Sequence, residues 1–188
     1  VQKIIKQKFQ ENRLKISSEG IYYLQSISNN DLGQIDNEIE KIACYSKKHA
    51  SITKEDILNH FYGFDAGNIF EFVDALGEKN IKHALNILYK LQSGEYHHLT
   101  ILNMINRQIR LLLMVKFEQD KQYKAEGKIK LPPFVVNKLK KQSRNYTISE
   151  LKNIFPKLLD AEIKIKTGYF YPAIILEKLV VDIALKNK

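Results

Sequence analysis

The sequence is poor in cysteine and contains no long apolar run. Cys44 is its single cysteine, so no disulfide can form within the chain, and no Cys and His lie at zinc-finger spacing. This cysteine usage fits a reducing cytoplasm. The longest uninterrupted apolar run, Leu111 to Val115, is far shorter than the roughly 18 residues that a membrane span requires. The sequence therefore predicts a cytoplasmic protein without a membrane partner.

Motifs for nucleotides, metals and local catalysis are also missing. None of the eight glycines belongs to a GxxxxGK or GxGxxG pattern, which a phosphate-binding loop requires. His97 and His98 are adjacent and diverge on a helix, while His49, His60 and His83 have no metal-ligating partner three or four residues further on. We predict no cofactor, no metal and no catalytic residue. An enzyme with a helical fold stays open as an alternative, because distant residues can converge on one site.

Apolar residues recur at helical spacing along the whole chain, and strict alternation is absent, so we predict an all-α fold. A first helix is expected over residues 1–12. Ser18 is expected to cap a second helix, and Asp31 a third. A short fourth helix is expected to begin at Thr53, which faces Asp56 at the spacing of a capping box. The first three of these helices are expected to pack as a bundle.

The remaining residues are expected to form a second group of helices after a hinge at residues 63–67. The longest apolar helix, residues 96–119, should be central, because apolar side chains cover most of its circumference. Residues 121–130 are polar and are expected to form a mobile connection. Pro156 predicts a break or kink within its helix. The other expected helix starts are Asn68, Asn80, residues 132–133, Thr147 and Pro172.

The central helix carries one polar stripe. Asn103, Asn106, Arg107 and Arg110 are spaced by three, one and three residues, so all four share a face. The two arginines could bind phosphate or an acidic partner, or pair with carboxylates across a bundle. We favour a structural or interface role, because the planar guanidinium fork matches interhelical carboxylates.

Positive charge is concentrated in the second half of the chain. The net charge is +9, and residues 121–166 alone hold twelve Lys and Arg against four acidic residues. Such a cluster can follow phosphates or an acidic partner, and it can equally be a solvated face. The composition leaves both interpretations open.

An aromatic triplet follows the last lysines of this cluster. Tyr169, Phe170 and Tyr171 come directly after Lys164 and Lys166, the basic and aromatic combination that holds unpaired bases. We expect Phe170 and Tyr171 to fill a helix junction instead. For Tyr169 a DNA-binding role with Lys164 and Lys166 and a packing role stay open.

Two long stretches carry a resemblance to a known family. Residues 31–57 read DLGQIDNEIEKIACYSKKHASITKEDI, and residues 69–116 read IFEFVDALGEKNIKHALNILYKLQSGEYHHLTILNMINRQIRLLLMVK. A weaker match includes LPPF at residues 131–134 and LLDAEIKIKTGY at residues 158–169. Together they resemble the lid and the start of the collar in the delta subunit family of the bacterial DNA polymerase III clamp loader.

The resemblance implies an AAA+-type helical lid bundle at residues 1–62 and a helical collar domain at residues 66–188. It implies a structural and oligomerisation role in a five-subunit clamp loader, with the other loader subunits as partners and primed DNA as a possible ligand. The sliding clamp is expected to bind an N-terminal domain that is missing from this sequence. Tyr169 matches a family position near the primer-template junction. The alternative function is a stand-alone basic helical module that binds nucleic acid.

Overall fold

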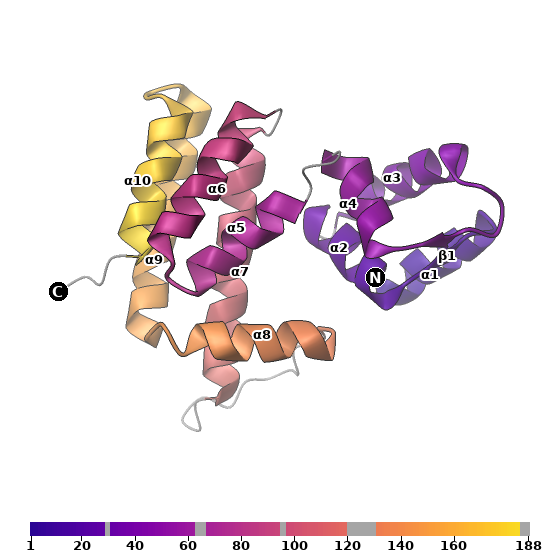
Figure 1. Cartoon of the computed structure of the whole chain (residues 1–188), viewed down its shortest axis with the longest axis horizontal. Coiled ribbons are helices and arrows are strands. Elements are labelled where there is room, and N and C mark those ends of the chain that lie inside the picture. Colours follow the sequence, from indigo (N-terminus) through magenta and orange to yellow (C-terminus); the bar gives the residue numbers. More distant parts are fainter. Residues whose placement is uncertain (29–30, 63–66, 95–96, 120–130, 185–188) are drawn as a thin grey trace. The chain divides into compact units, whose positions relative to one another are not determined.

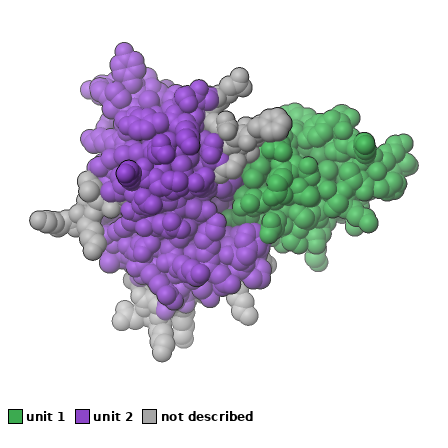
Figure 2. All heavy atoms as spheres, in the orientation of Figure 1, with its two compact units in different colours: residues 1–67 green, residues 68–188 purple. Residues whose placement is uncertain are grey.

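The structure is a computed structural model that describes residues 1–28, 31–62, 67–94, 97–119 and 131–184. The chain forms two compact units, unit 1 (Val1–Gly67) and unit 2 (Asn68–Lys188), which Figure 2 shows in green and purple. Helices account for nearly all of the regular structure, so the predicted all-α class is confirmed. Residues 63–66 of the predicted hinge at 63–67 and the predicted connection at residues 121–130 lie outside the described residues, and Gly67 is already the first residue of helix α5 (Gly67–Gly77).

Unit 1 is a small helical bundle. Its elements are α1 (Gln2–Glu11), β1 (Lys15–Ile16), α2 (Ser18–Ile27), α3 (Leu32–Tyr45), β2 (Ser51–Ile52) and α4 (Lys54–Tyr62). Within the bundle α2 packs on α4 and α1 packs on α3. Its core consists mainly of aliphatic side chains with Phe9, and removing them from water drives the packing.

The sequence did not predict the two strands. They pair in parallel, with Lys15 opposite Ser51 and Ile16 opposite Ile52. Two residues are too few to show alternation, and their partners are far apart in the chain, so a local pattern cannot reveal them. The pairing joins the end of α1 to the start of α4.

Most predicted helix starts in unit 1 are confirmed. Asp31 accepts a hydrogen bond from the backbone N–H of Gln34 at 3.0 Å. Thr53 and Asp56 exchange side-chain and backbone bonds at the predicted capping box. The predicted cap Ser18 is wrong by one residue, because Ser17 accepts the bond from Gly20 and Ser18 is already helical.

Unit 2 consists of helices packed around a central one. Its helices are α5 (Gly67–Gly77), α6 (Ile81–Ser93), α7 (His98–Gln119), α8 (Pro133–Ser143), α9 (Ile148–Thr167) and α10 (Pro172–Ala184). As predicted, the long helix α7 is central and packs against α8, α9 and α10. In Figure 1, α6, α7, α9 and α10 run in roughly the same direction, and α8 lies across the lower part of α7. No helix in the described ranges is both long and apolar enough to cross a membrane.

The starts of four helices in unit 2 agree with the sequence. Asn80 accepts from the backbone of His83, and Pro133 occupies the first turn of α8. Thr147 and Glu150 form a complete capping box at the start of α9. The C-cap of α9 is Gly168 at φ 66°, a left-handed conformation in which glycine is unstrained. Helix α10 begins at Pro172, also as predicted.

Two predictions about the limits of helices in unit 2 are wrong, namely the cap at Asn68 and a break at Pro156. The predicted cap Asn68 lies inside α5, which already begins at Gly67. Helix α9 also runs without a break through Pro156, from Ile148 to Thr167. The proline removes the hydrogen bond to the carbonyl of Lys152, but both residues are exposed, so water can take the place of the missing donor.

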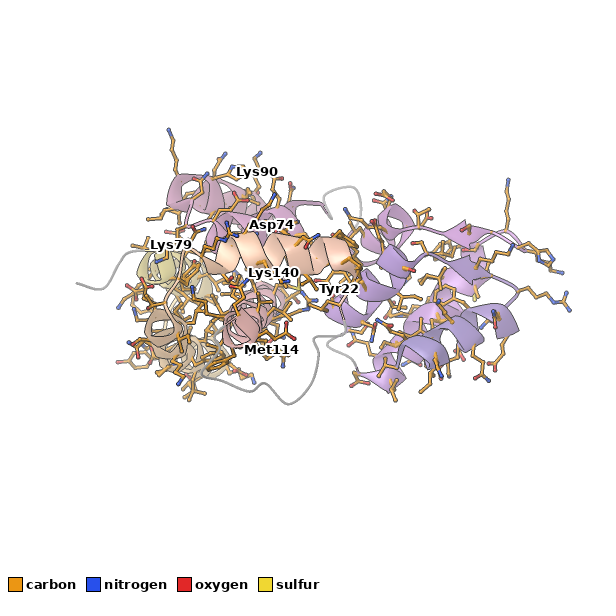
Figure 3. All side chains as sticks on the ribbon, turned by 90° about the horizontal axis from the view of Figure 1, so that it is seen from below. Tyr22, Asp74, Lys79, Lys90, Met114 and Lys140 are labelled. Atoms are coloured by element: carbon orange, nitrogen blue, oxygen red, sulfur yellow. The ribbon has the colours of Figure 1, made fainter. Side chains whose placement is uncertain are left out.

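A buried polar network joins α5, α7 and α8. Gln108 donates to Oε1 of Gln142 at 2.7 Å, and Nε2 of Gln142 donates to Oδ1 of Asp74 at 3.0 Å. The hydroxyl of Tyr146, just after α8, donates to the backbone carbonyl of Leu76. Asp74 lies beside α8 in Figure 3. Each of these buried polar groups therefore has a partner, which keeps the cost of burying it low.

Candidate functional site

The predicted polar stripe of α7 lies on the surface of unit 2. Asn103, Asn106 and Arg110 are exposed, and Arg107 is half-buried. The exposed Met114 continues the stripe four residues beyond Arg110. The structure thus brings the predicted interface residues onto one accessible face.

Exposed apolar side chains of α9 lie next to this stripe. A hollow of about 430 Å³ between α7 and α9 is lined by Leu102, Asn103, Asn106, Phe155, Pro156, Leu158, Leu159 and Glu162. Leu159 is 59% exposed and Ile163, one helical turn further on, is 53% exposed. Sequence reasoning missed these two residues, because an apolar position in a helix is normally assigned to the core. We call Asn103, Asn106, Leu159 and Ile163 the α7–α9 face.

Large exposed apolar groups beside amide groups are the composition of a protein interface. The apolar groups supply area that leaves water on association, and the amides supply orientation at the rim. Arg110 makes no ion pair within the described ranges, so its guanidinium is available to a carboxylate of another molecule.

The aromatic triplet forms an exposed tip between α9 and α10. Tyr169 is 78% exposed and Tyr171 is 74% exposed, and Phe170 is also exposed. The prediction that Phe170 and Tyr171 fill a helix junction is therefore wrong. Gly168 ends α9 and Pro172 begins α10, so the short connection between them projects the three rings outward.

The two predicted basic residues near this tip are already paired. Lys164 bonds Asp160 and Lys166 bonds Glu162, each one turn apart on α9. Exposed pairs of this kind contribute little to stability, about 0.3–0.5 kcal/mol, so a phosphate can displace the carboxylate. Beside them a mainly apolar hollow of about 580 Å³ lies between α9 and α10, and Tyr169 and Phe170 form part of its wall.

A group of titratable side chains joins α3 to α4 in unit 1. His60 bonds Glu38 at 2.6 Å through Nε2 and the hydroxyl of Tyr45 at 2.7 Å through Nδ1. Burial raises the pKa of Glu38, but hydrogen bonds and charge from Lys41 and His60 outweigh burial and lower it. Burial, with the charges of Asp56 and Glu38, raises the pKa of Tyr45. Tyr45 thus stays protonated and is a poor nucleophile, so the group acts as a clasp between two helices.

No group of three or more His, Cys, Asp or Glu side chains within the described ranges could hold a metal ion. His83 bonds Glu71 at 2.8 Å and His60 belongs to the clasp.

Comparison with known proteins identifies the family. A family model described as the DNA polymerase III delta subunit, C-terminal domain, matches residues 66–183, and a second model, described as a middle domain, matches residues 1–59. The DNA polymerase III subunit delta of Bacillus subtilis (strain 168) is 25% identical over 176 residues, covering 92% of this chain and 51% of that protein. The probable DNA polymerase III subunit delta of Aquifex aeolicus (strain VF5) is 24% identical over 163 residues, which cover 84% of this chain and 47% of that protein.

A solved structure has the same fold. The Bacillus subtilis DNA clamp loader delta protein aligns with a TM-score of 0.55 at 23% identity, covering 97% of this chain and 55% of that one. This chain therefore spans about half the length of the relatives it matches. The resemblance noted in the sequence is confirmed. Because the C-terminal domain model covers well over half of its residues, the chain belongs to the DNA polymerase III delta subunit family.

Proposed function

We propose that the chain is the structural and oligomerisation part of a clamp-loader delta subunit, with a lid at residues 1–62 and a collar at residues 66–188. It joins the other loader subunits in a five-subunit assembly that loads the sliding clamp onto primed DNA. Family membership and the named Bacillus relative support this role. We assign contact with the sliding clamp to the half of the relatives that this chain does not match.

The observation that carries the proposal is the α7–α9 face. Leu159 and Ile163 expose large apolar side chains at neighbouring positions on α9, beside the asparagines of α7. A specific interface buries about 800 Å² on each partner, with a few desolvated anchors dominating the affinity. We assign the anchor role to Leu159 and Ile163, and Arg107 and Arg110 to the polar part of the same surface.

Mixing the chain with the other loader subunits of the same source is expected to give a stable complex in size-exclusion chromatography with light scattering. The double variant Leu159→Asp/Ile163→Asp is expected to weaken that complex by at least about 30-fold, the loss of an anchor worth about 2 kcal/mol. The new charges would have to be desolvated in the interface, which adds to the loss.

Leu32→Asp is the matched control, because Leu32 is exposed on α3 in unit 1. It is expected to leave the complex unchanged. Far-UV circular dichroism shows whether each variant retains its helices. A wild-type chain that stays monomeric in the mixture would refute the proposal, and equal binding by the double variant and the control would remove the α7–α9 face from it.

Tyr169 is proposed to stack on an unpaired base of the primed DNA, assisted by Lys164 and Lys166. Its exposure beside two lysines supports this role. In the full-length protein within its loader, Tyr169→Ala is expected to slow clamp loading on primed DNA roughly tenfold, since stacking contributes about 1–3 kcal/mol per base. Tyr169→Phe keeps the ring and is expected to retain most of the activity.

Tyr171→Ala is the control for this experiment, because Tyr171 is equally exposed in the same connection. It is expected to affect loading less than Tyr169→Ala. Unchanged loading by Tyr169→Ala would end the stacking proposal and leave the association proposal intact.

The comparisons do not support the alternative of a stand-alone nucleic-acid module, since the match to the delta family covers most of the chain. We also propose that the chain performs no catalytic step of its own. Its contribution is then to hold subunits, and the DNA between them, in position.

A further inference from the structure

The exposed side of α8 is strongly basic. Between residues 127 and 149 the chain has six Lys and Arg residues and no Asp or Glu. On α8 and at its C-cap, Asn137, Lys140, Lys141 and Arg144 are spaced by three, one and three residues, so they share one side of the helix, and all are exposed. We call Lys140, Lys141 and Arg144 the α8 basic face. Lys140 is labelled on α8 in Figure 3.

The nearby carboxylates do not neutralise this face. Asp74 pairs with Lys138 at 2.6 Å, and Glu150 pairs with Lys79 at 2.9 Å. Within the described ranges the side chains of Lys140, Lys141 and Arg144 form no ion pair or hydrogen bond. Their positive charge is therefore uncompensated and points to solvent.

A polar hollow of about 610 Å³ adjoins this face where α8 ends and α9 begins. Arg144, Ser149, Asn153 and Lys116 line part of it, and so does Glu150, whose carboxylate is paired with Lys79. Nζ of Lys116 donates to the backbone carbonyl of Ser143 at 3.0 Å. Ser149 and Asn153 form no side-chain hydrogen bond within the described ranges, and both are exposed. A guanidinium, a hydroxyl and an amide are the donors that proteins use for phosphate oxygens.

We propose that the α8 basic face and the adjoining hollow bind the phosphate backbone of a nucleic acid. The composition of the exposed surface favours a nucleic acid over an acidic protein as the partner. Phe134, in the first turn of α8, is the one large hydrophobic side chain that this helix exposes, and from Val135 to Leu158 the described chain exposes none. A protein interface needs a group of desolvated apolar anchors. Backbone binding needs cations and hydrogen-bond donors, and both are present here.

This site is separate from the aromatic tip. Helix α9 has 20 residues and is therefore about 30 Å long. The hollow lies at its first residues, and Tyr169 lies beyond its last. The inference does not depend on the collar assembly, since the α7–α9 face takes no part in it.

The test is a fluorescence-anisotropy titration of the whole 188-residue chain with a labelled 30-nucleotide oligothymidylate and, separately, a 30-base-pair duplex, across a range of salt concentrations. The variant Lys140→Ala/Lys141→Ala/Arg144→Ala is expected to bind at least about tenfold more weakly in low salt. The slope of log affinity against log salt is expected to fall by about 2 to 3, because up to three phosphate contacts are lost.

The charge-matched control is Lys47→Ala/Lys82→Ala/Lys90→Ala, which removes three exposed lysines from α6 and unit 1. It is expected to keep the wild-type salt slope. Should the triple variant lose its helical circular dichroism, Lys140→Gln/Lys141→Gln replaces it, with an expected drop in slope of about 1 to 2. Equal slopes for the variant and the control, or no salt-dependent binding by the wild type, would overturn the proposal. Neither result bears on subunit association.

Discussion

Replacing Gly77 with alanine is expected to lower the free energy of unfolding of unit 2 by about 2–4 kcal/mol. A Cβ at Gly77 would lie 2.6 Å from Cδ of Gln142, 2.7 Å from its Oε1 and 3.1 Å from Nε2 of Gln108. The amide of Gln142 can retreat only by giving up its bonds to Gln108 and Asp74. Either the clash or the loss of buried hydrogen bonds then destabilises the packing of α5 on α7 and α8.

Gly33→Ala is the matched control for Gly77→Ala. A Cβ at Gly33, in α3, would meet only Oδ1 of Asp31 at an ordinary 3.4 Å. The control is expected to be neutral or to stabilise unit 1 by up to about 1 kcal/mol, because alanine is the better helix former. Since the two units can unfold separately, hydrogen exchange measured on peptides of each unit is the suitable readout. Unchanged exchange protection in unit 2 of Gly77→Ala would show that the side chains of Gln108 and Gln142 can move aside without loss of stability.

Tyr146→Ala is expected to destabilise unit 2 by about 3–5 kcal/mol, the range for a large buried ring. Tyr146 is almost completely buried, its hydroxyl donates to the carbonyl of Leu76, and Nζ of Lys79 lies 4.4 Å from the ring centroid. Burial, followed by the charge of Glu150, raises the pKa of Tyr146, so the hydroxyl keeps its proton and remains a donor. The substitution leaves a cavity and removes one of the two hydrogen bonds that the Leu76 carbonyl accepts, the other coming from the backbone N–H of Lys79 at 3.0 Å.

Two further variants separate these contributions. Tyr146→Phe keeps the ring and is expected to cost only about 0.5–1.5 kcal/mol, the net contribution of one hydrogen bond, because the Leu76 carbonyl keeps its bond from the backbone N–H of Lys79. Tyr89→Ala removes an exposed tyrosine of α6 and is expected to change stability by less than about 0.5 kcal/mol. The measurement is urea unfolding followed by helical circular dichroism, with hydrogen exchange to assign the transition to unit 2. Similar losses for Tyr146→Ala and Tyr89→Ala would contradict the anchoring role.

The sequence predicted those parts of the fold that depend on neighbouring residues. Asp31, Asn80 and the Thr147–Glu150 pair cap their helices through bonds that span three positions, so the local pattern is sufficient. Ser17 and Ser18 both carry a hydroxyl that can cap the helix, and the local pattern does not distinguish between them. The network of Asp74, Gln108 and Gln142 joins three helices, and only the tertiary structure brings its members together.

The sequence predicted one of the candidate surfaces and missed parts of the others. The polar stripe of α7 was visible because helical periodicity places Asn103, Asn106 and Arg110 on one face. The exposure of Leu159 and Ile163 could not be predicted, because the sequence does not show whether another helix covers an apolar residue. The same limit explains the error at Phe170 and Tyr171, since the sequence does not show that the connection between α9 and α10 projects outward.

The parallel pairing of β1 with β2 also sets an order of events during protein synthesis. Ser51 leaves the ribosome 36 residues after its partner Lys15, which at about 5–20 residues per second takes roughly two to seven seconds. By the end of that interval α1, α2 and all of α3 have been made, but the partner strand that joins the end of α1 to the start of α4 has not. Unit 1 therefore cannot be completed from its N-terminal end alone, and the nascent chain exposes the core side chains of α2 that pack on α4 until α4 emerges.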